Sequence, residues 1–223
     1  MTERLASAEA DAAFKAFVGD LRFPCLGAKG AVQRRGYRIG VHGVLGSARF
    51  SETLASDLSA FLRHSPADGA AFTAFVAVFP KDPPVGERAF ERRLWIQLQL
   101  LHECDPAAGR WDPAVSDDLA NAHFSFSFAS RAMFVVGLHP HSSRLARRFR
   151  WPALVFNPHA QFQHLRAEGR FERLRTRIRE REIDLQGSLN PNLADFGESS
   201  EARQYSGRET EAEWRCPFHR RAP

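Results

Sequence analysis

The spacing of apolar and polar positions divides the chain into helical and extended segments. Apolar residues recur at helical spacing over 7–19, after Ser51 and over 87–102, and this pattern predicts three amphipathic helices. Alternating or continuous apolar residues over 37–45 and 70–79 predict extended segments, the first of them a strand or an extended turn. The first half of the chain therefore mixes both kinds of element.

The middle of the chain carries the clearest strand pattern. Residues 123–128 (HFSFSF) alternate aromatic residues with serine, which is typical of a half-buried strand. The near-continuous apolar runs 133–138 and 153–156 predict central strands. The arginine-rich segment 161–181 predicts one long helix with an apolar inner face. The tail from Ile183 is irregular, but its aromatic and glycine residues predict an ordered cover over a site.

These elements predict one α+β domain over residues 1–223. Its sheet would be mixed or mainly antiparallel, with helices packed on it and an ordered, irregular C-terminal tail. A length of 223 residues suits one domain with a well-buried core. The order of the strands does not follow from this pattern.

Composition restricts the location and the partners. No apolar run is long enough to cross a bilayer, and acidic residues interrupt the N-terminal segment where a signal peptide would be continuously apolar. We therefore expect a cytoplasmic protein with no membrane partner. The 3 cysteines are widely spaced, which predicts neither a disulfide framework nor a paired zinc site. The net charge is +5, and most of the positive charge is arginine, which suits carboxylate or phosphate recognition.

Two histidines follow the apolar runs of the middle segment closely. His139 follows 134–138, and His159 follows 153–156 after an Asn-Pro pair. A neutral imidazole is a good iron ligand, and guanidinium groups bind the propionates of haem. We expect either histidine to be the iron ligand and the other to line the opposite side of the same pocket. The segment between the two histidines contains four arginines: Arg144, Arg147, Arg148 and Arg150.

Other interpretations of these residues are weaker. The arginine cluster could neutralise phosphates, but no nucleic-acid-binding module is present, and we expect no nucleic-acid partner. Cys25 is either a thiolate ligand or a buried small hydrophobic residue. No glycine-rich phosphate loop, G-x-S-x-G or H-E-x-x-H motif is present, which argues against a nucleotide cofactor and against hydrolases. The arginines over 173–181 fit a solvated helix face.

A series of short motifs, in a fixed order, extends over nearly the whole chain. They are Phe23-Pro24-Cys25 with Ala28-Lys29, Trp111-Asp112, His123-Phe124-Ser125-Phe126-Ser127, Gly137-Leu138-His139-Pro140, Ser143-Arg144, Arg147-Arg148-Phe149, Phe156-Asn157-Pro158-His159, Gln161-Phe162, Gln186-Gly187-Ser188, Asn190-Pro191, Ser200-Glu201-Ala202, Gln204-Tyr205-Ser206-Gly207-Arg208 and Cys216-Pro217-Phe218. With these motifs the chain resembles the YqcI/YcgG family. Better understood members of that family are haem-dependent N-hydroxylases of the pre-guanitoxin and cycloserine-pathway type.

The resemblance implies a function and a cofactor. We expect a haem-dependent monooxygenase or peroxygenase of natural-product biosynthesis, which hydroxylates a nitrogen of an arginine-like amino acid or guanidino compound. It would use haem b, an axial histidine, and O2 or hydrogen peroxide. His159 is the favoured iron ligand and His139 the second. A haem-binding sensor or carrier without substrate turnover is the alternative function. An electron-donor protein and a homodimer stay open as partners.

The resemblance also suggests roles for other side chains. A cationic substrate needs an acid, and His139, Glu198 and Glu201 are the expected catalytic residues. Asp195 and Glu103 are further acidic candidates. The expected partners of the haem propionates and of the substrate carboxylate are arginines: Arg144, Arg147 and Arg148 for the propionates, and Arg208 or Arg203 for the substrate. The tail over 186–208 would keep water from the iron.

Overall fold

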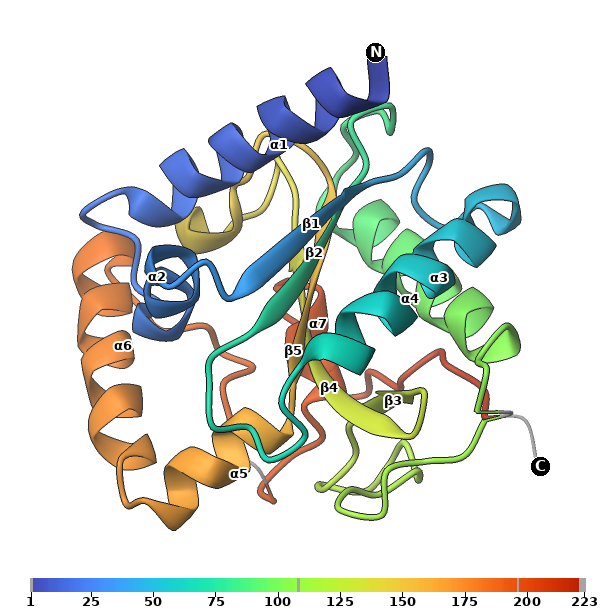
Figure 1. Ribbon diagram of the computed structural model, residues 1–223. Coiled ribbons are helices and arrows are strands. Elements are labelled where there is room, and N and C mark those ends of the chain that lie inside the picture. The colour runs from blue at the N-terminus through green and yellow to red at the C-terminus, as the bar shows by residue number, and fades with distance from the viewer. Residues whose placement is uncertain (1, 108, 196, 221–223) are drawn as a thin grey trace.

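The computed structural model describes residues 2–107, 109–195 and 197–220, and it has one mixed sheet (Figure 1). The order of the strands in the described chain is β1-β2-β5-β4-β3, and only β1 and β2 are parallel neighbours. The strands are β1 (Tyr37–Val41), β2 (Ala74–Val78), β3 (Phe126–Phe128), β4 (Arg131–Leu138) and β5 (Ala153–Pro158). The fold is α+β with a mixed, mainly antiparallel sheet, as predicted.

Helices cover both faces of this sheet. The helices of the described residues are α1 (Thr2–Gly19), α2 (Leu26–Gln33), α3 (Ala48–His64), α4 (Glu87–Glu103), α5 (Ala160–Ala167), α6 (Phe171–Gln186) and α7 (Ala202–Tyr205), with a short 3₁₀ turn η1 (Leu145–Arg147). In Figure 1, α1, α2 and α6 lie on one side of the sheet, and α3 and α4 lie on the other. None of these helices combines the length and the apolar character that a membrane span requires.

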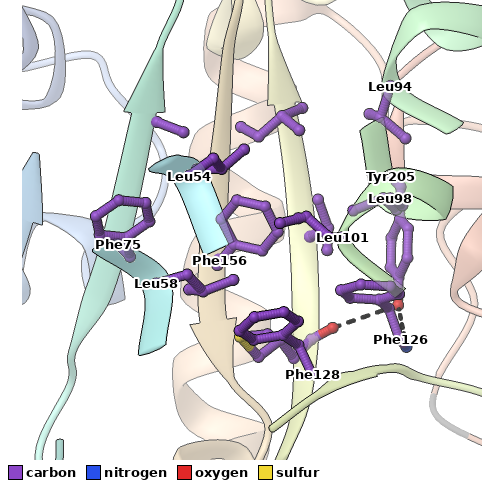
Figure 2. Close-up of a cluster of buried hydrophobic side chains, with 14 of the residues drawn as sticks. Leu54, Leu58, Phe75, Leu94, Leu98, Leu101, Phe126, Phe128, Phe156 and Tyr205 are labelled. Atoms are coloured by element: carbon purple, nitrogen blue, oxygen red, sulfur yellow. Dashed lines mark hydrogen bonds between the residues drawn. The ribbon is translucent and has the colours of Figure 1, made fainter. Parts of the chain in front are cut away.

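Side chains pack differently on the two faces of the sheet. Leucines of α3 and α4 pack against Phe75 and Phe156 in a solid core, which Figure 2 shows together with Tyr205 at its edge. Alternate residues of the same strands project to the opposite face, where Phe134, Val136 and Val155 lie towards α1, α2 and α6. The space on that second face is only partly filled, and it contains the cavities described below.

The helices differ in several details from the sequence-based expectation. The segment 161–181 is two helices, α5 and α6, because Gly169 adopts a left-handed conformation (φ +67°) that ends the first helix. Helix α3 starts at Ala48, before Ser51, and the Ser51 hydroxyl donates to the Ser47 carbonyl. Helix α2 was not predicted from the sequence.

The predicted strand over 123–128 is shorter and more deeply buried than expected. Only β3 (Phe126–Phe128) forms ladder pairs, and Ser125 and Ser127 are as buried as the neighbouring phenylalanines. The C-terminal tail is ordered, as expected, and Phe218 packs in the core on the α3 and α4 side. The alternating phenylalanines and serines of this segment are therefore all buried, and the pattern does not mark a solvent-exposed face.

Gly69 provides a test of how closely the chain packs around the start of α5. A Cβ on Gly69 would lie 2.3 Å from the backbone of Ala160, and its φ is +70°. Gly169 has a similar φ of +67° but nothing within 4 Å. Both alanine substitutions therefore incur left-handed strain of about 1–2 kcal/mol. We expect Gly69→Ala to lose roughly 1–3 kcal/mol more unfolding free energy in urea than Gly169→Ala, because it adds a clash. Equal losses would contradict this packing.

Candidate functional site

Two adjoining cavities lie on the sheet face that α6 covers. We call the first, of about 210 Å³, the His159 cavity, and its walls include Phe162, Phe171 and Glu201. The second, of about 280 Å³, is the Cys25 cavity, which lies among α1, α2 and the sheet. The two share wall residues: Phe134, Phe162, Ile178, Glu182, Leu193 and Gln204. Their walls are mainly apolar, as ligand pockets usually are.

His159 is held rigidly in the wall of the first cavity. It follows β5 and is the N-cap residue of α5, and its backbone amide donates to the Ala132 carbonyl at 2.8 Å. Its side chain is only 4% exposed. Burial, with Arg166 nearby, lowers the pKa of His159 to about 4. The imidazole is therefore neutral at physiological pH, which is the form that binds iron.

Glu201 is the acid beside this histidine. Its Oε2 lies 3.9 Å from His159 Nε2, which is too long for a hydrogen bond. Its Oε1 accepts two hydrogen bonds, from the Ser125 hydroxyl at 2.6 Å and from the Tyr205 hydroxyl at 2.7 Å. Burial raises the pKa of Glu201 to about 7 despite these donors. The two hydroxyls donate to Oε1, whereas Oε2 faces His159.

Ser125 and Tyr205 were not among the predicted site residues. Both are fully buried, and the Tyr205 hydroxyl also accepts the backbone amide of Phe126, as Figure 2 shows. Through their hydroxyl groups, the residue that precedes β3 and the last residue of α7 both bind the Glu201 carboxyl group. The HFSFSF pattern contained a signal for Ser125, because a buried serine in an aromatic strand needs a polar partner.

Charged side chains of α5, α6 and the tail form the outer part of the same cavity. The Asp195 carboxylate pairs with Arg175 and, at 2.9 Å, with Arg179. The Cζ atom of Arg166 lies over the Phe171 ring, 4.1 Å from its centroid. Burial lowers the pKa of Arg166, and the nearby carboxyl groups of Glu201 and Asp195 oppose that shift. Arg175 and Arg179 therefore contribute to a cavity wall, whereas the sequence placed them on a solvated helix face.

The Cys25 cavity is lined by a thiol and by two arginines, of which Arg144 is buried and Arg147 is half-buried. Cys25 is the N-cap residue of α2, and its Sγ accepts the amide of Ala28 at 3.4 Å. Burial raises the pKa of the Cys25 thiol, which favours its neutral form. Arg144 pairs with Glu182 at 2.7 Å, and Arg147 donates to the Gly137 carbonyl and to carbonyls of α7. Both arginines line the cavity, but their guanidinium groups already bind protein groups.

His139 lies on the other face of the sheet. Its ring stacks on Phe90 of α4 with 4.3 Å between centroids, and neither ring nitrogen has a hydrogen-bond partner among the described residues. Burial lowers its pKa to about 4. The β4–β5 register pairs Phe134 with Asn157, so even residues of β4 share a face with odd residues of β5. The prediction that His139 and His159 line opposite sides of one pocket is therefore wrong.

Several other predicted residues lie outside both cavities. Glu198 is exposed and accepts the backbone amide of Asp195 at 2.9 Å. Arg208 forms a buried ion pair with Glu91 of α4 at 2.8 Å, on the face of His139. The remaining ones are Arg148, which donates to the Ser142 carbonyl, Arg203, which donates to carbonyls of the tail, and Glu103, which is exposed at the end of α4. The structure thus brings His159, Glu201 and Asp195 together and leaves these residues apart.

The shifted pKa of Glu201 predicts a pH dependence of stability. The folded protein holds this proton up to about pH 7, whereas the unfolded chain releases it near 4.5, so the folded state binds more protons between these values. The contribution of Glu201 to the free energy of unfolding therefore falls as pH rises through this window, by up to about 3 kcal/mol. We expect Glu201→Gln to lack this decrease in urea titrations. His139 and His159 have the opposite slope in both proteins, so the difference isolates Glu201.

The matched control is Glu198→Gln, which changes an exposed carboxylate of the same tail. It should keep the wild-type pH profile. If Glu201→Gln and wild-type protein show parallel profiles between pH 4.5 and 7, Glu201 is not a neutral buried acid.

The metal-binding side chains and the comparisons with known proteins restrict what kind of site this is. No group of three or more His, Cys, Asp or Glu side chains in the described residues could hold a bare metal ion. The search of curated proteins and the search of solved structures each gave no match. The family model described as the YqcI/YcgG family matches residues 14–219, which is most of the chain. The chain belongs to the YqcI/YcgG family.

Proposed function

We propose that this protein is a haem-dependent N-hydroxylase of an amino acid or guanidino compound, and that His159 binds the haem iron. The observation that carries the proposal is a neutral, buried imidazole in the wall of an apolar cavity. Among the described residues that line the two cavities, His159 is the only histidine. Membership of the YqcI/YcgG family supports the same assignment through the members that the sequence resembles.

The side chains around His159 fit a haem group. Phe134, Phe162 and Phe171 offer flat apolar surfaces to a porphyrin, and a haem iron needs only one protein side chain as its proximal ligand. Arg144 and Arg147 of the adjoining cavity remain our candidates for the propionates. Propionate binding there would compete with the Glu182 carboxylate for Arg144.

The reaction requires an oxygen atom, protons and a positioned substrate. When bound, haem would supply an iron that activates O2 or hydrogen peroxide for transfer of one oxygen atom to nitrogen. With O2, the second oxygen atom leaves as water, which consumes two protons and two electrons from a donor. With hydrogen peroxide, water is again the second product and no external electrons are needed.

Glu201 provides the proton chemistry of the chain itself. In its neutral form it can donate the proton on Oε2 into the cavity, and in its ionised form it can hold a cationic guanidinium group. Ser125 and Tyr205 fix the orientation of the carboxyl group through Oε1. Leu193 and the aromatic side chains of the wall would exclude bulk water around the reacting nitrogen.

The test of haem binding is the absorption spectrum of protein expressed with added haem precursor. We expect a Soret band in wild-type protein and in His139→Ala, whose side chain lies on the other sheet face. Cys25→Ser removes the thiol of the adjoining cavity and should also keep the band. His159→Ala should lose it and regain it with added imidazole. A band lost in Cys25→Ser but kept in His159→Ala would move the iron ligand to sulfur, and no band in any preparation would refute haem binding.

A second test separates an enzyme from a haem-binding sensor or carrier. We expect haem-loaded wild-type protein to convert arginine or a related guanidino compound to its N-hydroxy product, measured by mass spectrometry. Glu201→Gln should keep the Soret band but lose roughly 100-fold or more in turnover, because its amide cannot donate the proton. Glu198→Gln, at the tail surface, should match wild-type protein. No product from any arginine-like compound with fully loaded protein would favour the sensor or carrier.

A further inference from the structure

Three readily oxidised aromatic side chains lie in a row next to the His159 cavity. Phenol and indole rings lose an electron more easily than the rings of phenylalanine and histidine. The rings of Tyr205 and Trp95 are stacked with 5.6 Å between their centroids, and the centroid of Trp214 lies 6.1 Å from that of Trp95. These separations are those of aromatic rings in contact. An electron can therefore pass from each ring to the next.

The Tyr205 end of this row adjoins the His159 cavity. The Tyr205 hydroxyl donates to Glu201 Oε1 at 2.7 Å, and Glu201 Oε2 lies 3.9 Å from His159 Nε2. The ring of Tyr205 also packs edge-on against Phe134, which lines the cavity, with 5.7 Å between their centroids. Tyr205 therefore lies directly behind the cavity wall.

The other end of the row reaches the surface. Tyr205 is fully buried and Trp95 of α4 is 3% exposed, whereas Trp214 of the C-terminal tail is partly exposed. A small reductant in solution can therefore contact Trp214 but neither of the other two rings. The row thus connects the solvent with the wall of an enclosed cavity.

The polar atoms of Tyr205 and Trp95 suit them to different steps. A phenol loses its proton together with an electron, and Glu201 Oε1 is within hydrogen-bond distance to accept that proton. The Nε1–H group of Trp95 is buried and has no hydrogen-bond acceptor among the described residues. An oxidised Trp95 ring therefore keeps its proton and stays a strong oxidant, which takes an electron from Trp214.

We propose that Trp214, Trp95 and Tyr205 form a path along which single electrons pass from the surface to the His159 cavity. The use of this path rests on the proposed function, because an oxidant generated at haem in the absence of substrate would otherwise attack the cavity wall. The path supplies electrons that consume the oxidant harmlessly. Indole and phenol rings give up electrons only to strong oxidants, so the path does not compete with ordinary electron donors.

The electrons and protons of this protective reaction balance. Hydrogen peroxide takes up two electrons and two protons when it is reduced to two molecules of water. Each electron leaves Tyr205, whose phenolic proton moves to Glu201 and returns when Trp95 refills the ring. Trp214 then refills Trp95. A reductant such as ascorbic acid refills Trp214 at the surface, and its oxidation to dehydroascorbic acid supplies the two electrons and the two protons.

The path is tested first in haem-free protein, so that the result does not depend on the proposed function. Azide radicals made by pulse radiolysis oxidise tryptophan selectively, and the oxidation then moves along the same path in the opposite direction. In wild-type protein we expect the absorption band of the tryptophan radical to decay while that of the tyrosine radical grows, at a rate independent of protein concentration. Tyr205→Phe and Trp95→Phe should lose this growth.

Two other aromatic residues provide matched controls. Tyr37 is the second of the 2 tyrosines, and its hydroxyl also donates to a carboxylate, but its ring packs on a phenylalanine. Trp151 is partly exposed and has an arginine over its ring, as Trp214 has, but it packs on the opposite face of the sheet. Tyr37→Phe and Trp151→Phe should keep the tyrosine band. If Tyr205→Phe also keeps it, or wild-type protein never shows it, the path does not exist.

The protective use is tested in haem-loaded protein that receives hydrogen peroxide without substrate. We expect wild-type protein to gain oxygen atoms on Trp214, located by peptide mass spectrometry, and ascorbate to prevent this. Trp95→Phe should shift the oxidation to Tyr205 and the cavity wall and should bleach the Soret band faster. Trp151→Phe should match wild-type protein. Equal bleaching and the same oxidised residues in wild-type protein and Trp95→Phe would overturn the protective use.

Haem binding and the electron path fail separately. A wild-type protein without a Soret band refutes haem binding, and the haem-free measurement then decides whether the path exists. A Soret band in a protein whose tyrosine-radical band does not grow keeps haem binding and refutes the path. Thermal melting curves of all variants establish that they are folded, so that a lost signal reports on the missing ring.

Discussion

The antiparallel register of β4 and β5 is the constraint on which the site depends. Pairing Phe134 with Asn157 puts even residues of β4 and odd residues of β5 on one face. His159 therefore joins the cavity face, and His139 joins the solid core of α3 and α4. A shift of one residue would exchange these positions and also turn the apolar side chains of β4 to the wrong faces. The core packing and the position of the histidine are thus fixed together.

The buried carboxyl group of Glu201 links the fold to the chemistry. Ser125 before β3 and Tyr205 in α7 both donate to its Oε1, so the carboxyl group holds the tail against the sheet. A buried acid is tolerated because these donors satisfy one oxygen and because the group can stay protonated. The same arrangement leaves Oε2 beside His159. The hydrogen-bond network that holds the tail therefore also orients the carboxyl group that we propose as a proton donor.

The sequence predicted much of the fold, because helices and strands follow from local periodicity. The two central strands, the position of His159 just after the second of them and the ordered tail all followed from the pattern. The break at Gly169 was missed because a single glycine can also lie inside a helix. Ser125 was missed because it lies 76 positions from Glu201, and Tyr205 was missed because the tail was expected to be irregular and helix α7 was not predicted.

The candidate site was harder to predict, because it depends on strand order and register. His159 and Glu201 were named from motifs, and the structure brings them together. His139 and Arg208 were named in the same way, yet both lie on the opposite face. The pattern of a strand shows that its residues alternate, but it does not show which neighbour pairs with which residue. Arg173 and Arg177 of α6 are exposed, as expected, whereas Arg175 and Arg179 line the cavity, because their pairing with Asp195 depends on how the tail folds back.

The central claim is that the deep part of this cavity holds a haem iron on His159. A crystal structure of the haem-loaded protein tests it most directly. We predict iron bonded to a ring nitrogen of His159, with the porphyrin packed against Phe134 and Phe162. Iron bonded to His139 or to the Cys25 sulfur, or a porphyrin bound outside both cavities, would contradict this account.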